Sequence, residues 1–126
     1  MYQLGLNRNF SARHYLIGGD WGAENHEHAH QYRLECILKS NILDQHGYLI
    51  DIVELNRALD QILLDYADKT LNSCSAFKDL NPSLENFARI LNHALRGQLC
   101  TDSLTSIEII LWEDEEAWAS YTHLVQ

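Results

Sequence analysis

The spacing of apolar residues changes along the chain from a period of two to a helical period and back. This change limits the possible folds more than any other feature. Residues 31–40 alternate between apolar and polar side chains, as a strand with one buried face does, and residues 2–12 form a second predicted strand. Residues 105–113 and 117–123 predict two further strands after the helical region.

Two helical patterns separate these pairs of strands. Asp51 and Glu54 have the spacing of a capping box, and apolar residues then recur at helical intervals to about residue 67. Pro82 and Ser83 begin a second helix that ends near Gly97. The order ββααββ predicts an α+β fold, with two helices on one face of a four-stranded antiparallel sheet. Open sheet edges favour closure by symmetric neighbours, so we expect an oligomer.

Length and charge exclude several classes of function. The 126 residues are expected to form a single domain, 1–126. Nine basic against eighteen acidic residues give a net charge of −9, without any basic run, so we expect no nucleic-acid partner. No apolar stretch approaches the ~20 residues of a membrane helix, so we expect no membrane partner. Three widely spaced cysteines fit a reducing compartment, and the predicted location is cytoplasmic.

Three histidines at every second position, His26, His28 and His30, form the main functional motif. Alternate side chains of an extended segment share a face, so His28 and His30 are expected to point to a common place. A catalytic zinc typically has three protein ligands and one open position, and His14 is the candidate for the third. The other interpretation is a solvated surface run. His26 is a ligand, a residue that orients a ligand, or a surface residue.

Five short motifs follow one another over nearly the whole length of the chain. They are Phe-Ser-Ala-Arg-His at 10–14, His-Ala-His-Gln-Tyr at 28–32, Ile-Asp at 50–51, Pro-Ser-Leu-Glu-Asn at 82–86, and Glu113 with Tyr121. In this order they resemble the motifs of the 6-pyruvoyl-tetrahydropterin synthase and 6-carboxy-tetrahydropterin synthase family. The corresponding family patterns are Phe-Ser-Ala-x-His, His-Gly-His-Asn-Tyr, Val-Asp or Ile-Asp, Pro-Thr-x-Glu-Asn, and a glutamate and a tyrosine in the last hairpin.

The resemblance implies a tunnelling fold (T-fold), in which trimers form an oligomeric barrel and two trimers usually stack as a hexamer, with active sites between subunits. It implies 7,8-dihydroneopterin triphosphate as the substrate and Zn²⁺ held by His14, His28 and His30. It also implies that Glu113 binds the pterin ring, because a carboxylate can accept two parallel N–H bonds from the 2-amino-pyrimidinone edge. Without the resemblance, Glu113 is one solvated glutamate of the acidic run 113–116.

Two catalytic positions depart from the family pattern. The family's catalytic cysteine, four residues before the first histidine of His-x-His, is Glu24 here. The family's Leu-Asp-His reads here as residues 67–69, with Asp68 kept and Lys69 in place of histidine. A carboxylate beside zinc can act as a general base. Relatives with glutamate at or near this position produce 6-hydroxymethyl-7,8-dihydropterin, and Glu27 lies in the same window. Lys69 is either a proton donor or phosphate contact, or a solvated lysine near a helix end.

These residues predict a zinc-dependent pterin lyase with Glu24 as base and with Asp68 and Lys69 as a proton relay. The resemblance implies that its product is 6-hydroxymethyl-dihydropterin, 6-pyruvoyl-tetrahydropterin or 6-carboxy-tetrahydropterin, and that its pathway is that of folate, biopterin or queuosine. The alternative is a non-catalytic homologue that keeps the metal site and binds pterin without turnover. The expected partners are a small-molecule pterin and further copies of the chain, as a trimer or hexamer. Cys74 is a second candidate base or an inert loop cysteine, whereas Cys36 lies about 20 Å along the strand from His30.

Overall fold

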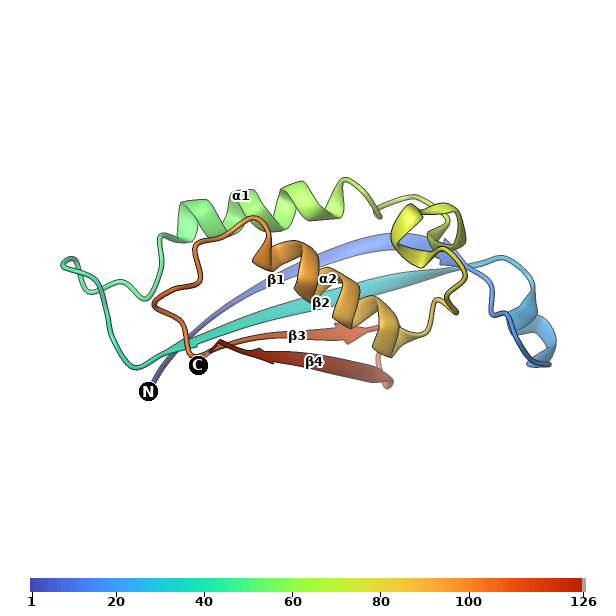
Figure 1. Ribbon diagram of the computed structural model, residues 1–126. Helices are drawn as coiled ribbons and strands as arrows, with labels where there is room; N and C mark the ends of the chain where they lie inside the picture. The colour runs from blue at the N-terminus through green and yellow to red at the C-terminus, as the bar shows by residue number, and fades with distance from the viewer. Residues whose placement is uncertain (126) are drawn as a thin grey trace.

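The computed structural model describes residues 1–125 and contains a four-stranded antiparallel sheet with both helices on one side (Figure 1). The strands are β1 (Tyr2–His14), β2 (His28–Ser40), β3 (Ser106–Trp112) and β4 (Trp118–Leu124), paired in the order β1-β2-β3-β4. The helices are α1 (Ile52–Leu63) and α2 (Leu84–Arg96). Short 3₁₀ turns are η1 (Gly22–Asn25), η2 (Leu71–Ser73) and η3 (Ser75–Phe77). The predicted α+β class and the order ββααββ are confirmed.

The core lies between the apolar face of the sheet and the two helices. Every second residue of β2 from Tyr32 to Leu38 is at most 2% exposed, whereas the residues between them are more exposed. This is the pattern of a strand with one buried face. Phe87 of α2 is the centre of an aromatic cluster, with its ring 5.3–5.9 Å from the rings of Phe10, Tyr32, Tyr66 and Phe77. The two helices therefore cover the face of the sheet that carries the predicted core residues.

Strands β1 and β2 are longer than their apolar alternation predicts. Their ladder continues to the pairs Ala12–His30 and His14–His28, so all three histidines lie on regular strand. The apolar alternation did not predict this continuation, because the added strand residues include the polar histidines. As a result, His28 and His30 have the same parity as Tyr32 and face the same side of the sheet.

Helix α1 ends at Leu63, earlier than its apolar stripe predicts. The next amides, of Asp65 and Tyr66, bond to carbonyls three residues back, which is 3₁₀ geometry. At the start of α1 the Asp51 carboxylate accepts from the Val53 amide at 2.9 Å, so the predicted cap is present. The reciprocal half of the capping box is not formed, because Glu54 pairs with Arg57 at 3.1 Å.

One buried polar side chain holds α2 against the last two strands. Asn92 is fully buried, and its amide donates to the carbonyls of Ile107 at 3.0 Å and Tyr121 at 3.1 Å. Its oxygen accepts from Arg96 Nε at 3.0 Å. Both hydrogens of the Asn92 amide are therefore donated to strand carbonyls, which joins α2 to β3 and β4.

Asn92→Ala is expected to lower the free energy of unfolding by about 1–3 kcal/mol, because it removes buried hydrogen bonds and leaves their partners unpaired. Urea unfolding followed by circular dichroism measures this change. His93→Ala, at the adjacent exposed position of α2, is the matched control and is expected to stay within about 0.5 kcal/mol of the parent. Equal stabilities of the two variants would contradict a structural role for Asn92.

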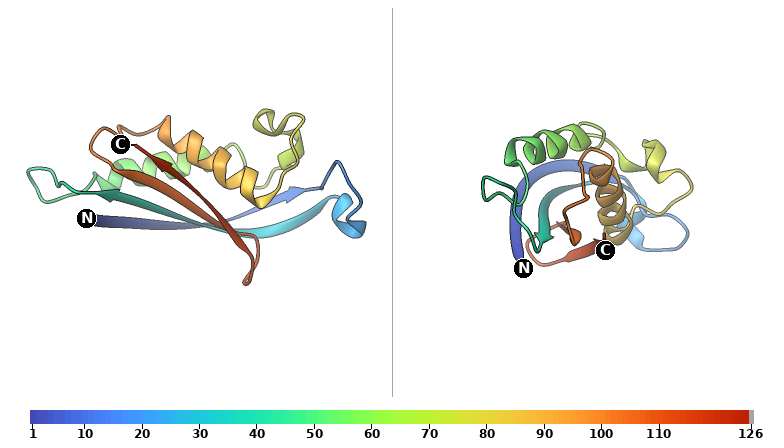
Figure 2. Two further views of the ribbon diagram at one scale, coloured as in Figure 1. Left: turned by 60° about the horizontal axis from the view of Figure 1, so that its bottom comes forward. Right: turned by 60° about the vertical axis from the view of Figure 1, so that its left-hand side comes forward.

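The two termini lie at one end of the elongated sheet, and the loop that contains η1 lies at the other (Figures 1 and 2). At that second end β1 and β2 reach beyond α1 and α2 (Figure 1). Within residues 1–125, neither helix has the length and apolar character required to cross a membrane.

Candidate metal and substrate site

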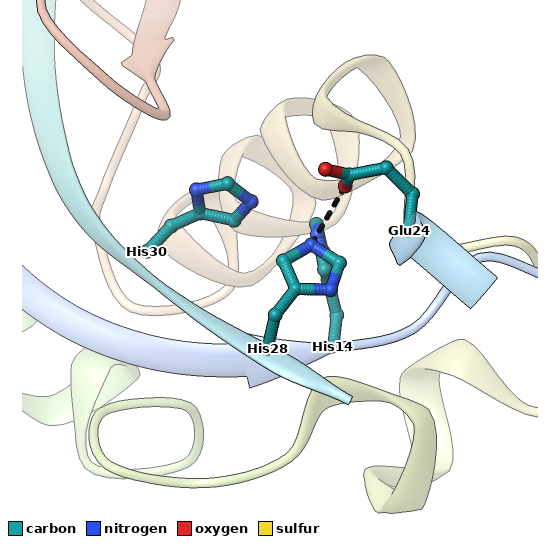
Figure 3. Close-up of side chains that lie close together, drawn as sticks. All are labelled: His14, Glu24, His28 and His30. Atoms are coloured by element: carbon teal, nitrogen blue, oxygen red, sulfur yellow. Dashed lines mark ion pairs between the residues drawn. The ribbon is translucent and has the colours of Figure 1, made fainter. Parts of the chain in front are cut away.

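Three imidazole rings and one carboxylate converge at the end of the sheet that is remote from the termini (Figure 3). His14 belongs to β1, His28 and His30 to β2, and Glu24 reaches over them from η1. Their possible ligand atoms all lie within 4.8 Å of one another. The three ring centroids are 4.6–4.9 Å apart, with the ring planes steeply inclined at 74–85°. The rings therefore surround a common point, as the ligands of a metal ion do.

The position of Glu24 depends on the hydrogen bonds of the loop between β1 and β2. The Leu16 amide donates to the Glu24 carbonyl at 2.8 Å. Asn25 donates to the carbonyls of Leu16 and Gly19, both at 3.0 Å, and accepts from the Trp21 amide at 2.7 Å. The loop is thus tied to the strand end on both sides of η1. These bonds hold the Glu24 backbone beside the three histidines.

His14 is kept in the uncharged form that a metal ion requires. The residue is only 3% exposed, and burial, together with the nearby His30 and His28, lowers its pKa to about 4. Its Nδ1 lies 3.2 Å from the Tyr32 hydroxyl, which orients the ring. Burial raises the pKa of Tyr32, so this hydroxyl stays protonated. A neutral imidazole in a defined orientation is the state that coordinates a metal ion.

The other two histidines present buried nitrogens that have no hydrogen-bond partner. His28 Nδ1 lies 2.7 Å from the carbonyl oxygen of His26, which can only accept, so Nδ1 carries the hydrogen and Nε2 carries the lone pair. Among the described residues, Nε2 of His28 and Nε2 of His30 are buried without a hydrogen bond. Because unpaired buried polar atoms are costly, a cation bound to these nitrogens explains them. The residues therefore fit a metal ion.

His26 contributes through its backbone and not through its ring. Its carbonyl orients His28, while the side chain is exposed and lies outside the cluster. The exposed side chain fits the surface-residue interpretation of His26, and the contact with His28 is made by the backbone carbonyl alone. The sequence motifs did not predict a role for this carbonyl or for the Tyr32 hydroxyl. The hydroxyl has a signal in the sequence, because Tyr32 continues the alternation of His28 and His30 on the same face.

Glu113 lies directly after β3 and next to the histidine cluster. Its Oε1 is 3.9 Å from His30 Nε2. The residue borders a cavity of about 290 Å³ that also contains His14 and Glu24. It also borders a second cavity of about 650 Å³, which is lined by His30 and by residues of the opposite face of β2 such as Arg33. The structure therefore brings the predicted pterin-binding carboxylate to the predicted metal ligands.

The structure does not bring Asp68 and Lys69 into this cluster. Both side chains are exposed, on a turn that runs beside the end of β1. The Asp68 amide donates to the Ser11 carbonyl at 2.6 Å, and the Arg13 amide donates to the Lys69 carbonyl at 2.9 Å. Lys69 borders a separate cavity of about 350 Å³ together with Cys74. Within one chain, the predicted relay residues lie apart from the metal cluster.

Neither candidate cysteine is an activated thiol in this structure. Cys36 is fully buried in the core, and burial raises its pKa to about 12. Burial also raises the pKa of Cys74, whose Sγ lies 3.6 Å from the backbone oxygens of Asp65 and Thr70. Since the thiolate is the reactive form, these environments favour inert thiols. This leaves Glu24 as the candidate base beside the histidines.

A model of the 6-pyruvoyl tetrahydropterin synthase family matches residues 3–124. The chain belongs to this family. Its membership is consistent with a pterin-metabolising lyase, and the predicted T-fold is confirmed. No curated protein sequence matches the chain.

Solved structures of 6-pyruvoyl tetrahydropterin synthases are similar over almost the whole chain. The Caenorhabditis elegans protein superimposes with a TM-score of 0.84 and 19% identity, covering 97% of this chain and 95% of that one. The Plasmodium vivax protein, as a catalytic-residue mutant with glutamate replaced by alanine, gives a TM-score of 0.83 and 15% identity over 98% of each chain. The Plasmodium falciparum protein gives 0.81 and 13%, again over 98% of each chain. At these identities the similarity establishes the fold.

Proposed function

We propose that the protein is a zinc-dependent pterin lyase that acts on 7,8-dihydroneopterin triphosphate or a related dihydropterin. The observation that carries this proposal is the convergence of His14, His28, His30 and the Glu24 carboxylate, with the Glu113 carboxylate 3.9 Å from His30 Nε2. Membership of the 6-pyruvoyl tetrahydropterin synthase family supports a pterin as the substrate. A glutamate is a catalytic residue in the related Plasmodium vivax enzyme, which supports a catalytic role for Glu24.

The ligand chemistry supports zinc as the metal. Three neutral imidazoles from His14, His28 and His30 form a ligand set typical of catalytic zinc. When bound, zinc acts as a Lewis acid that lowers the cost of removing a proton from the carbon next to a polarised oxygen. Tyr32 and the His26 carbonyl orient two of these ligands, and such outer contacts typically maintain affinity for the metal.

The two carboxylates are assigned different tasks. Glu24 is the general base that takes a proton from the side chain of the substrate, because it lies beside the metal ligands and its carboxylate is accessible. Glu113 is the pterin-binding residue, because its carboxylate can accept two parallel N–H bonds from the edge of the ring. With these two roles, the reacting side chain of the substrate would point toward η1. The pterin ring would lie near the hairpin between β3 and β4.

A relay role for Asp68 and Lys69 requires a second subunit. In one chain these residues lie outside the cavity that contains Glu24, so we assign them to the active site of a neighbouring chain in a trimer or hexamer. The outer strands β1 and β4 have open edges in one chain over most of their length, and such edges favour pairing with further copies.

Product analysis tests the proposed function. The purified zinc protein is incubated with 7,8-dihydroneopterin triphosphate, and the pterin products are identified by chromatography and mass spectrometry. Because glutamate replaces the family's cysteine, we expect cleavage of the side chain to 6-hydroxymethyl-dihydropterin; the 6-pyruvoyl and 6-carboxy tetrahydropterins are the other products of this reaction class. Binding of the substrate without any product would instead establish a non-catalytic pterin-binding homologue.

Glu113→Gln is expected to weaken binding of a neopterin analogue by about 1–3 kcal/mol, or about 5- to 150-fold in Kd, because the amide turns one acceptor into a donor. Bound zinc is expected to be unchanged. Isothermal titration calorimetry measures the affinity. The matched control is Glu115→Gln in the same acidic run, where the side chain is exposed. Equal affinities of the parent and Glu113→Gln would remove Glu113 from the pterin-binding site.

A further inference from the structure

We propose that Glu24 is a fourth metal ligand in the substrate-free protein, and that the incoming substrate displaces it. The inference rests on the metal site of the proposed function and gives Glu24 a second state. In the substrate-free protein the Glu24 carboxylate would be bound to the metal. Once the substrate has taken this coordination position, the same carboxylate would be free to act as the base.

The contact between Glu24 and His28 has the character of two neighbouring ligands. Glu24 Oε2 lies 2.8 Å from His28 Nε2 (Figure 3). The Nδ1 hydrogen of His28 is directed to the His26 carbonyl, so in the neutral ring Nε2 is an acceptor. The geometry at Nε2 is also not that of a hydrogen bond, since this buried atom has no hydrogen-bond partner among the described residues. Two lone-pair atoms this close repel each other unless a cation lies between them.

No other contact accounts for the position of the Glu24 carboxylate. Among residues 1–125, no backbone or side-chain donor forms a hydrogen bond with it, and His28 is its one ion-pair partner. By comparison, the neighbouring carboxylate of Glu27 accepts from the Thr70 hydroxyl at 2.7 Å. The Glu24 side chain is 51% exposed, while its backbone is tied to Leu16. The carboxylate can therefore leave the histidines by side-chain rotation alone, without breaking any other bond.

Displacement follows from what a catalytic metal needs. A zinc ion with three histidines and a carboxylate is fully coordinated, as structural zinc sites are, whereas catalytic sites have a position open to substrate. A substrate oxygen would therefore take the coordination position of Glu24, which would release the carboxylate. After the exchange, the released carboxylate remains next to the bound side chain, where its assigned role as base requires it.

Binding of azide to the cobalt-substituted protein tests this inference. Co²⁺ replaces zinc, and changes in the visible d–d bands report each ligand that enters its coordination sphere. We expect azide to bind to Glu24→Ala at least about tenfold more tightly than to the parent, because the alanine variant leaves the fourth position open. We also expect Glu24→Ala to bind Co²⁺ at least about tenfold more weakly in competition with a chromophoric chelator, because one ligand is lost.

Glu27→Ala is the matched control, because it removes a neighbouring negative charge that does not face the histidines. It is expected to match the parent in both measurements. Equal azide affinity in the parent and Glu24→Ala would overturn the inference, as would the same gain in Glu27→Ala. Unchanged or higher Co²⁺ affinity in Glu24→Ala would show an imidazolium–carboxylate pair with His28 instead. None of these outcomes changes the result of the product assay. That assay therefore tests the proposed function independently of this inference.

Discussion

His28→Ala is expected to yield a protein that folds but does not retain stoichiometric zinc. Loss of an orienting outer contact typically costs about 10- to 100-fold in metal affinity, and loss of a ligand is expected to cost more. His28 is one of three imidazoles that meet at one point, and its Nε2 has no other partner among the described residues. Metal analysis of the native protein is expected to show about one zinc per chain in the parent and almost none in the variant. His14→Ala and His30→Ala are expected to behave in the same way.

His26→Ala provides the matched control for these variants. It removes an imidazole from the same run of alternating histidines but keeps the backbone carbonyl that orients His28. We therefore expect it to retain zinc at the level of the parent. Circular dichroism verifies that each variant is folded before its metal content is compared. Stoichiometric zinc in His28→Ala would contradict the assignment of the metal site.

Glu24→Gln is expected to reduce turnover of 7,8-dihydroneopterin triphosphate by about 10²- to 10⁴-fold, the range that a general base contributes. The amide has nearly the same size and shape as the carboxylate but does not accept a proton at any accessible pH. The three histidines are expected to keep the zinc and Glu113 to keep the ring, so the loss is expected in kcat, while the affinity for a neopterin analogue stays the same or rises because Glu24 no longer competes for the metal. Initial rates of product formation and a parallel binding titration measure the two quantities.

Glu27→Gln is the control for turnover, because its carboxylate lies in the same segment but bonds to Thr70. Its rate is expected to stay close to that of the parent. Undiminished turnover in Glu24→Gln would mean that the carboxylate is not the base. The raised pKa of Cys74 and its separation from the histidines make that thiol a poor replacement, so the base would then be sought on a neighbouring subunit.

The fold was predictable because its elements follow local rules. Apolar alternation located the strands, and helical spacing with Asp51 and Ser83 located the starts of the helices, where both side chains cap the first turn. The ends of elements were less predictable. The β1–β2 ladder continues through the polar histidines, and α1 changes to 3₁₀ geometry while its apolar stripe continues through Tyr66.

The site was predictable only in part, for a related reason. His28 and His30 share a face by the period of a strand, and the cross-strand pair with His14 completes the set that the resemblance implied. The His26 carbonyl had no such signal, because any residue provides the same backbone atom. The positions of Asp68 and Lys69 depend on how a turn meets the edge of β1, and spacing in the sequence does not define that contact.

The turn at residues 68–70 also changes how much of β1 is available to another strand. Thr70 forms a parallel bridge with Arg13, and the Ser11 carbonyl and the Arg13 amide are already paired with this turn. A strand from a second molecule that adds to β1 must therefore stop before Ser11. The part of β1 before Ser11 is shorter than the full thirteen-residue strand. Its length is therefore closer to that of the seven-residue β4. The turn thus limits how far two chains can slide past each other along this edge, and a substitution in it would alter their alignment as well as the turn itself.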